Sequence, residues 1–265
     1  MYRRSNLPDD QVFYLDPCPQ NKKVILLLHG LGSDSSSWQM QIPPLISEGY
    51  RPIAIDIPGF GHSRFSARHW SIRRAALMII NQIIDPLQEP VILMGLSLGG
   101  VVAQKIVQYR SEQIDKLILV STFSRLHPKI KKNLPYLGRR MFQIFSGNIR
   151  AQAANVADHI FPKPEQKLWH DYLFSQIKSA NPRIYRQTML ALSTFNSRRW
   201  MKSSIIPCLV VTGSQDTTVT VQDQIRLAKI IPGAKHIFIQ NGGHAVNVDH
   251  FEQFNSELLN FLSNH

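Results

Sequence analysis

The chain has 265 residues, is 43% hydrophobic and carries a formal net charge of +12. No apolar run reaches the about 18 residues of a membrane span, and the arginine pair at positions 3 and 4 has no apolar segment behind it, which argues against an export signal. The two cysteines, Cys18 and Cys208, do not form a disulfide framework. We therefore expect a cytoplasmic protein with one large domain, or with a domain and an insertion.

The positive charge is concentrated in residues 124–203. This segment has 15 Lys and Arg against 3 Asp and Glu, whereas the rest of the chain has 15 of each sign. Such a surplus fits an anionic partner, for example a carboxylate-bearing substrate, an acyl carrier protein or an anionic membrane surface. A basic, merely solvated face is an equally good explanation. Nucleic acid is not expected, because the basic residues alternate with an apolar stripe and no recognition motif is present.

Apolar runs alternate with helix-forming segments along most of the chain. Continuous apolar runs are typical of strands that are buried on both faces of a parallel sheet, and alternation with helices predicts βαβ units. The fold class is therefore α/β, with a mostly parallel, doubly wound sheet. The expected strands are 11–15 (at an edge), 24–30, 52–58, 91–96, 116–120, 208–212 and 236–239, and the expected helices are 35–46, 72–87, the segment after 97, 221–231 and 251–262.

The strand signal stops between about residues 125 and 202. Apolar residues recur there at helical spacing over 130–145 and 164–177, and Asn181-Pro182 is a helix start. We expect an all-helical insertion, 124–203, placed after the sixth strand of a core domain that comprises 1–123 and 204–265. Most of its apolar stripe would pack against the core, and some side chains would line a substrate pocket, with Met141, Phe142 and Phe145 as possible members.

A strand-to-helix turn at Gly95-Leu96-Ser97-Leu98-Gly99 organises the sequence. A Gly-x-Ser-x-Gly motif between a buried strand and a helix is typical of a nucleophile elbow, in which the serine hydroxyl stands at the edge of the sheet. The motif alone occurs by chance in about one protein in ten of this size. Its interpretation therefore depends on finding a base, an acid and oxyanion donors elsewhere in the chain.

An acid and a base follow in the required order. Asp216 follows the predicted strand 208–212, and His244 follows the strand 236–239. Because these turns lie at the same edge of a parallel sheet as the elbow, Ser97, Asp216 and His244 can converge as nucleophile, acid and base. The backbone N–H of Leu98 and that of Leu31, just past the strand 24–30, are the candidate oxyanion donors.

Competing residues have simpler explanations. His29 ends a buried strand beside a glycine turn, which favours a structural role, and Asp56 and His62 fit loop hydrogen bonds. Asp223 lies in a capping box. No strand end presents Asp249 or His250, and the remaining histidines at 69, 127, 159, 170 and 236 have no partner pattern. We find no metal-ligand spacing and no dinucleotide or phosphate-binding motif, so no metal or cofactor is expected.

These motifs resemble those of the α/β-hydrolase superfamily, in the branch that holds small esterases, enol-lactonases, cofactor-free perhydrolases and carbon–carbon bond hydrolases. The resemblance covers nearly the whole chain outside the helical insertion, which matches the family's cap domain in position. It implies that Leu31 and Leu98 supply the oxyanion amides. A serine at position 97 argues against dehalogenase-like relatives with an aspartate nucleophile. The matching segments are His29-Gly30-Leu31-Gly32, Asp56-x-Pro58-Gly59-x-Gly61-x-Ser63, Gly95 to Gly100, Gly213-x-x-Asp216 and Gly243-His244-x-x-x-x-Asp249 with Phe254.

The chemistry that follows is acyl transfer through Ser97, on a small-molecule carboxylic ester or lactone. Two alternatives stay open: a carbon–carbon bond hydrolase that acts on a ring-cleavage product, and a hydrolase of thioesters or of esters linked to an acyl carrier. A non-catalytic binding protein of the same fold is disfavoured by the complete set of catalytic residue types. The oligomeric state is not predicted.

Overall fold

The computed structural model describes residues 10–127, 138, 142–143 and 146–263. Seven strands form one sheet in the order β1-β3-β2-β4-β5-β6-β7. The edge strand β1 runs antiparallel to β3, and all other neighbours are parallel. The predicted α/β class is confirmed. The strands are β1 Tyr14–Leu15, β2 Lys23–Leu28, β3 Tyr50–Ile55, β4 Val91–Leu96, β5 Ile114–Val120, β6 Cys208–Gly213 and β7 Lys235–Ile239.

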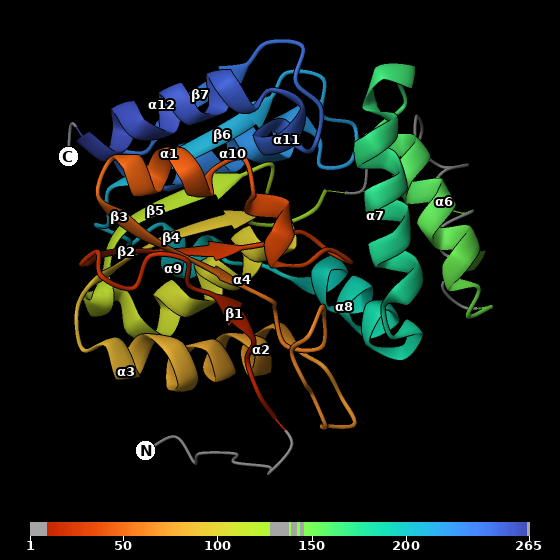
Figure 1. Cartoon of the computed structure of the whole chain (residues 1–265), viewed down its shortest axis with the longest axis horizontal. Helices are drawn as coiled ribbons and strands as arrows, with labels where there is room; N and C mark the ends of the chain where they lie inside the picture. The colour runs from red at the N-terminus through yellow and green to blue at the C-terminus, as the bar shows by residue number, and fades with distance from the viewer. Residues whose placement is uncertain (1–9, 128–137, 139–141, 144–145, 264–265) are drawn as a thin grey trace.

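Helices cover both faces of the sheet (Figure 1). Residues from α1, α11 and α12 pack on one face, and residues from α2, α4 and α10 pack on the other. The helices are α1 Ile42–Ser47, α2 Ile72–Ile79, α3 Asp85–Leu87, α4 Leu98–Arg110, α6 Ile149–Ile160, α7 Lys167–Ser179, α8 Pro182–Thr194, α9 Arg198–Met201, α10 Val221–Ile230, α11 Val246–Asp249 and α12 Phe251–Ser263. Among these described helices, none has both the length and the apolarity that a bilayer span requires.

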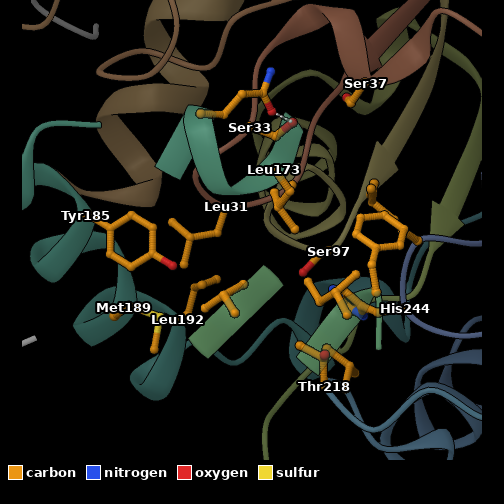
Figure 2. A pocket seen from close by; sticks show the side chains of 18 of the residues that line it. Leu31, Ser33, Ser37, Ser97, Leu173, Tyr185, Met189, Leu192, Thr218 and His244 are labelled. Carbon is orange, nitrogen blue, oxygen red and sulfur yellow. Dashed lines mark hydrogen bonds between the residues drawn. The ribbon is translucent and has the colours of Figure 1, made fainter. Parts of the chain in front are cut away.

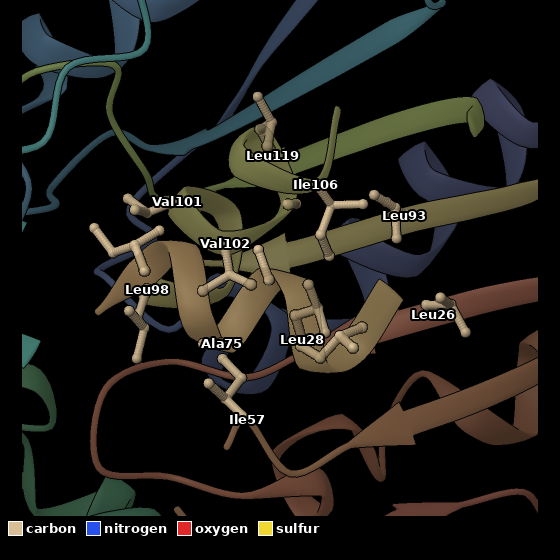
Figure 3. Packing of buried hydrophobic residues seen from close by; sticks show 14 of the residues in the cluster. Leu26, Leu28, Ile57, Ala75, Leu93, Leu98, Val101, Val102, Ile106 and Leu119 are labelled. Atoms are coloured by element: carbon tan, nitrogen blue, oxygen red, sulfur yellow. The ribbon is translucent and has the colours of Figure 1, made fainter. Parts of the chain in front are cut away.

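The apolar runs of the sequence form the core because alternate side chains of each strand meet a different helix layer. Leu26 and Leu28 of β2 contact the layer of α2 and α4, whereas Ile25 and Leu27 contact the layer of α1 and α12. Figure 3 shows the first of these layers, in which strand leucines meet Ala75 of α2 and small or β-branched side chains of α4. The central strands are thus buried on both faces, as their composition predicts.

A helical segment separates β5 from β6. In Figure 1, α6, α7 and α8 stand together beside the sheet. Five strands precede this segment in the described chain, where six were expected, and the early edge strand spans only Tyr14–Leu15. Two of the expected helices are confirmed as α7 and α8, and Asn181 is the N-cap of α8. The expected helix over 130–145 lies outside the described residues, except at 138 and 142–143. The division into a core and a cap domain stays a prediction.

Local predictions differ from the structure at three places. The expected helix over 35–46 is two pieces, a 3₁₀ turn Ser35–Trp38 capped by Asp34 and the short helix α1. The expected helix over 72–87 is continuous but contains the π-helical turn Ile80–Ile84 between α2 and α3. Helix α6 was not predicted, although Asn148 caps its first turn and apolar residues recur at helical spacing within it.

A close backbone approach at Gly99 fixes helix α4 against the sheet. A Cβ atom at this position would lie 2.0 Å from the carbonyl oxygen of Leu28 in β2. No flexible side chain could yield to relieve this contact, because the opposing atom belongs to the backbone of a central strand. Only glycine therefore lets α4 begin directly after β4 at this depth.

We expect Gly99→Ala to destabilise the fold by about 3 kcal/mol or more, within the range of severe single substitutions, because the added methyl group must displace backbone. Gly138→Ala is the matched control, since no atom of the described residues lies within 4 Å of a Cβ there. Urea unfolding followed by circular dichroism measures both. A Gly99→Ala protein as stable as the control would contradict the steric explanation.

Candidate active site

Ser97 occupies a strained turn between β4 and α4. Its φ of 53° and ψ of −108° lie outside the regions that non-glycine residues ordinarily adopt. Neighbouring strand ends hold this conformation: the Ser97 N–H donates to the Val120 carbonyl at 2.9 Å, and the Thr122 hydroxyl donates to the Ser97 carbonyl at 2.8 Å. The geometry is that of the predicted elbow, and it presents the Ser97 side chain at the carboxyl edge of the sheet.

Asp216 and His244 lie together at the same edge. The Nδ1–H of His244 donates to Oδ2 of Asp216 at 2.9 Å, and both side chains are buried. Since a carboxylate only accepts, the hydrogen bond places a proton on Nδ1, and in the neutral imidazole the lone pair is then on Nε2. The predicted acid and base are thus a hydrogen-bonded pair from the turns that follow β6 and β7.

The Asp216 carboxylate has a complete set of donors. Its Oδ1 accepts the backbone N–H groups of Thr218 and Val219 at 2.8 and 3.0 Å, and its Oδ2 accepts Nε2 of Gln224 at 2.8 Å in addition to His244. These donors offset the cost of burying a carboxylate that pairs with no Lys or Arg among the described residues. Gln224, in α10, is fully buried, and sequence reasoning did not single it out.

Ser97 and His244 line the same pocket, of about 290 Å³, beneath helices α6, α7 and α8. Figure 2 shows the two side chains next to each other on one wall, with Leu173, Tyr185 and Met189 on the surrounding walls. The lining is mostly apolar. Of the lining residues that the structure describes, none is Lys, Arg, Asp or Glu.

Two backbone amides flank the pocket near Ser97. Leu31 follows β2 and lines the pocket, and Leu98 is the first residue of α4. Within the described residues, neither N–H donates to an acceptor, and the Leu98 amide lies at the positive end of the helix. Both predicted oxyanion donors are therefore free to bind a developing negative charge.

Helix α7 is fastened to the loop that follows Leu31. Oε1 of Gln176 accepts the Ser33 hydroxyl at 2.8 Å, and its Nε2 donates to the Ser36 hydroxyl at 3.3 Å. The Tyr172 hydroxyl contacts the same Ser36 hydroxyl. Burial and the neighbouring Asp34 raise the pKa of Tyr172 to about 12, so that its phenol stays protonated at neutral pH.

His29 has the predicted structural role. Its Nδ1–H donates to the Gly30 carbonyl at 2.7 Å, and its Nε2 accepts the Ile57 N–H at 2.8 Å, which ties the end of β2 to the loop after β3. Complete burial lowers the pKa of His29 below its usual 6.5, because desolvation disfavours the imidazolium. Asp56 likewise accepts the N–H groups of Ser35 and His62, at 2.7 Å each.

Other predictions have mixed outcomes. Thr220 caps α10 because its hydroxyl oxygen accepts the Asp223 N–H at 3.2 Å, as the capping box predicts. The buried Asp223 also pairs with His127 at 2.8 Å, which the sequence did not indicate. Phe142, expected as a possible pocket residue, faces solvent with 74% of its surface exposed and does not line the pocket. Met141 and Phe145 lie outside the described residues. No group of three or more potential metal ligands gathers in the described part of the chain.

A family model of the α/β-hydrolase fold matches residues 23–251. The chain belongs to this family. It is 27% identical over 274 aligned positions to the 2-hydroxy-6-oxononadienedioate/2-hydroxy-6-oxononatrienedioate hydrolase of Escherichia coli, an alignment that covers 94% of this chain and 90% of that protein. Family membership therefore supports hydrolase activity on a small molecule.

Solved structures share the fold at low identity. The enol-lactonase from Burkholderia xenovorans LB400 superposes with a TM-score of 0.83 and 21% identity, over 96% of both chains. A bromoperoxidase from Bacillus anthracis superposes with a TM-score of 0.85 and 22% identity, over 96% of this chain and 95% of that one. At these identities the likeness concerns the fold alone.

The burial of His29 predicts how the free energy of unfolding depends on pH. As the pH falls below about 6.5, His29 takes up a proton in the unfolded chain but stays neutral in the folded protein. The free energy of unfolding therefore decreases, by up to about 1.4 kcal/mol per pH unit. His29→Asn removes this contribution, and its unfolding free energy should fall less between pH 7.5 and 5.5. Urea unfolding of both proteins at the two pH values measures the difference. Equal losses in the two proteins would contradict a neutral, buried imidazole.

Proposed function

We propose that this chain is a serine hydrolase that cleaves a neutral carboxylic ester or lactone through an acyl-enzyme on Ser97. The observation that carries the proposal is the His244–Asp216 pair, at 2.9 Å, on the wall of the pocket that the strained Ser97 also lines. Nucleophile, base and acid of this kind activate a hydroxyl that is otherwise a poor nucleophile at neutral pH.

The proposed mechanism follows from the positions of these groups. Ser97 Oγ attacks the carbonyl carbon while its proton passes to Nε2 of His244. The N–H groups of Leu31 and Leu98 stabilise the oxyanion of the tetrahedral intermediate. His244 then protonates the departing alkoxide as the carbon–oxygen bond to it breaks. In the second half, His244 takes a proton from the attacking water and gives it to Ser97 Oγ when the acyl–Ser97 bond breaks and the acid leaves. Asp216 keeps the proton of the imidazole on Nδ1 throughout.

We further infer that residues 124–203 form a cap domain that sets substrate choice, with residues 1–123 and 204–265 as the core. Helices α6, α7 and α8 of this segment supply Val156, Leu173 and Met189 to the pocket, while Ser97 and His244 come from the core. The catalytic groups and most of the apolar wall thus come from different segments, which leaves specificity free to vary without change in the chemistry.

Release of p-nitrophenol from esters of increasing acyl length tests the proposal. We expect turnover by the native protein, with a length optimum set by the pocket, and a loss of about 10⁴-fold or more in kcat for Ser97→Ala. Ser263→Ala, at the far end of α12, is the matched control, since within the described residues its hydroxyl bonds only to the nearby Asn260 carbonyl. Activity retained by Ser97→Ala would refute the assignment of the nucleophile.

Carbon–carbon bond hydrolysis is the second candidate, and the similarity to the Escherichia coli hydrolase favours it. The substrate named for that protein is a dioate and carries two carboxylates. The described lining of the pocket in this chain offers such a charge no Lys or Arg, and burial of an unpaired carboxylate is costly. This difference supports the neutral ester or lactone as the first choice.

We therefore expect kcat/KM for 2-hydroxy-6-oxononadienedioate to be about 100-fold or more below that for the best neutral p-nitrophenyl ester, because the described lining offers its carboxylates no Lys or Arg. The decay of dienol absorbance and the release of p-nitrophenol measure the two rates under the same conditions. Comparable values of kcat/KM would instead favour the carbon–carbon hydrolase.

A further inference from the structure

The proposed chemistry leaves unused two buried pocket hydroxyls that have no hydrogen-bond partner among the described residues, those of Thr218 and Tyr185, and Tyr185 is the more deeply buried residue. Tyr185, in α8, is only 1% exposed, and its hydroxyl has no hydrogen-bond partner among the described residues. The residue lines the pocket, and Figure 2 shows its oxygen directed into the interior from the wall opposite Ser97. The labelled side chains around it, Leu31, Met189 and Leu192, are apolar.

The ring of Tyr185 is held in place from two sides. A Cβ atom at Gly32, whose φ is +77°, would lie 2.9 Å from Cε2 of Tyr185 and 2.7 Å from Cγ1 of Ile177. The loop after β2 therefore approaches the ring closely at Gly32, and Ile177 of helix α7 lies next to the same glycine. The backbone of Tyr185 is fixed as well, since its N–H donates to the Asn181 carbonyl at 2.9 Å in the first turn of α8.

An unpaired buried hydroxyl is unfavourable, and phenylalanine would fill the same space without that cost. We propose that the Tyr185 hydroxyl binds the substrate, by donating a hydrogen bond to a neutral oxygen on the acyl group. The substrate class is then an ester or lactone whose acyl chain carries an oxo, hydroxyl or ether oxygen away from the scissile carbonyl. A neutral oxygen is specified because the described lining has no Lys or Arg to balance a charge.

This inference rests on the proposed function, since it assigns a substrate class to the same pocket. Tyr185 would be a specificity residue that contacts the substrate at a distance from the reacting atoms. Ser97 and His244 would process a plain alkanoyl ester without its help. Oxygenated and plain substrates are therefore expected to respond differently to loss of the hydroxyl.

The test compares p-nitrophenyl heptanoate with its analogues that carry an oxo group at C4, C5 or C6. For the native protein we expect one oxo isomer to have the highest kcat/KM. In Tyr185→Phe that isomer should lose about 10- to 100-fold in kcat/KM, the usual effect of leaving one buried hydrogen-bonding group unpaired, whereas heptanoate changes less than about 3-fold. The position of the preferred isomer then reports the span from Ser97 to Tyr185.

Tyr50→Phe is the matched control, because the Tyr50 hydroxyl bonds to the Leu262 carbonyl at 3.4 Å, near the C-terminal end of α12. Thermal midpoints of both variants separate a folding effect from a binding effect. If Tyr185→Phe lost the same factor in kcat/KM on all four esters, the inference would be overturned. That result is expected if the hydroxyl only fills space or binds a water molecule. An unchanged rate on every oxo ester would also overturn the inference.

A second measurement separates failure of the inference from failure of the proposed function. If the native protein hydrolyses no ester, the acyl-transfer proposal fails, and the binding of the oxo and plain esters to Ser97→Ala can still be measured by calorimetry. There we expect Tyr185→Phe to weaken binding of the preferred oxo ester about 10-fold and of heptanoate little. Binding that the substitution does not change would overturn the assignment of Tyr185.

Discussion

The whole site depends on the contact between the start of α4 and the backbone of β2. Because Gly99 has no side chain, α4 can lie against the Leu28 carbonyl and begin directly after β4. The chain must then turn within one residue, and this residue is Ser97, in an unfavourable backbone conformation. The packed core on both faces of the sheet supplies the stability that holds this strain.

The second constraint is the buried charge of Asp216. Four donors reach its carboxylate, and they come from the loop after β6, from α10 and from the turn after β7. The carboxylate thus links three elements that are distant in the sequence. A negative charge that is fixed in this way can orient His244 with no Lys or Arg among the described lining residues, most of which are apolar.

The sequence predicted those features that depend on local pattern. The β4 run Val91–Leu96 is apolar because both of its faces are buried, and the strand-end positions of Asp216 and His244 follow from the parallel sheet. Features that depend on packing between distant segments were not predictable. The partners of Gln224 and of His127 arise only when α10 meets the loop after β6 and the start of the helical segment. The exposure of Phe142 and the orientation of the Tyr185 hydroxyl also depend on packing between distant segments.

The bonds of α7 to the loop after β2 have a consequence for how the pocket is entered. Gln176 binds Ser33, which is two residues from the Leu31 amide, and Tyr172 contacts Ser36 in the next turn. An outward movement of helix α7 would have to break these bonds, and it would leave the segment that carries Leu31 without its contacts to that helix. If Leu31 supplies an oxyanion donor, as proposed, the position of helix α7 and the order of the oxyanion site are coupled through Gln176.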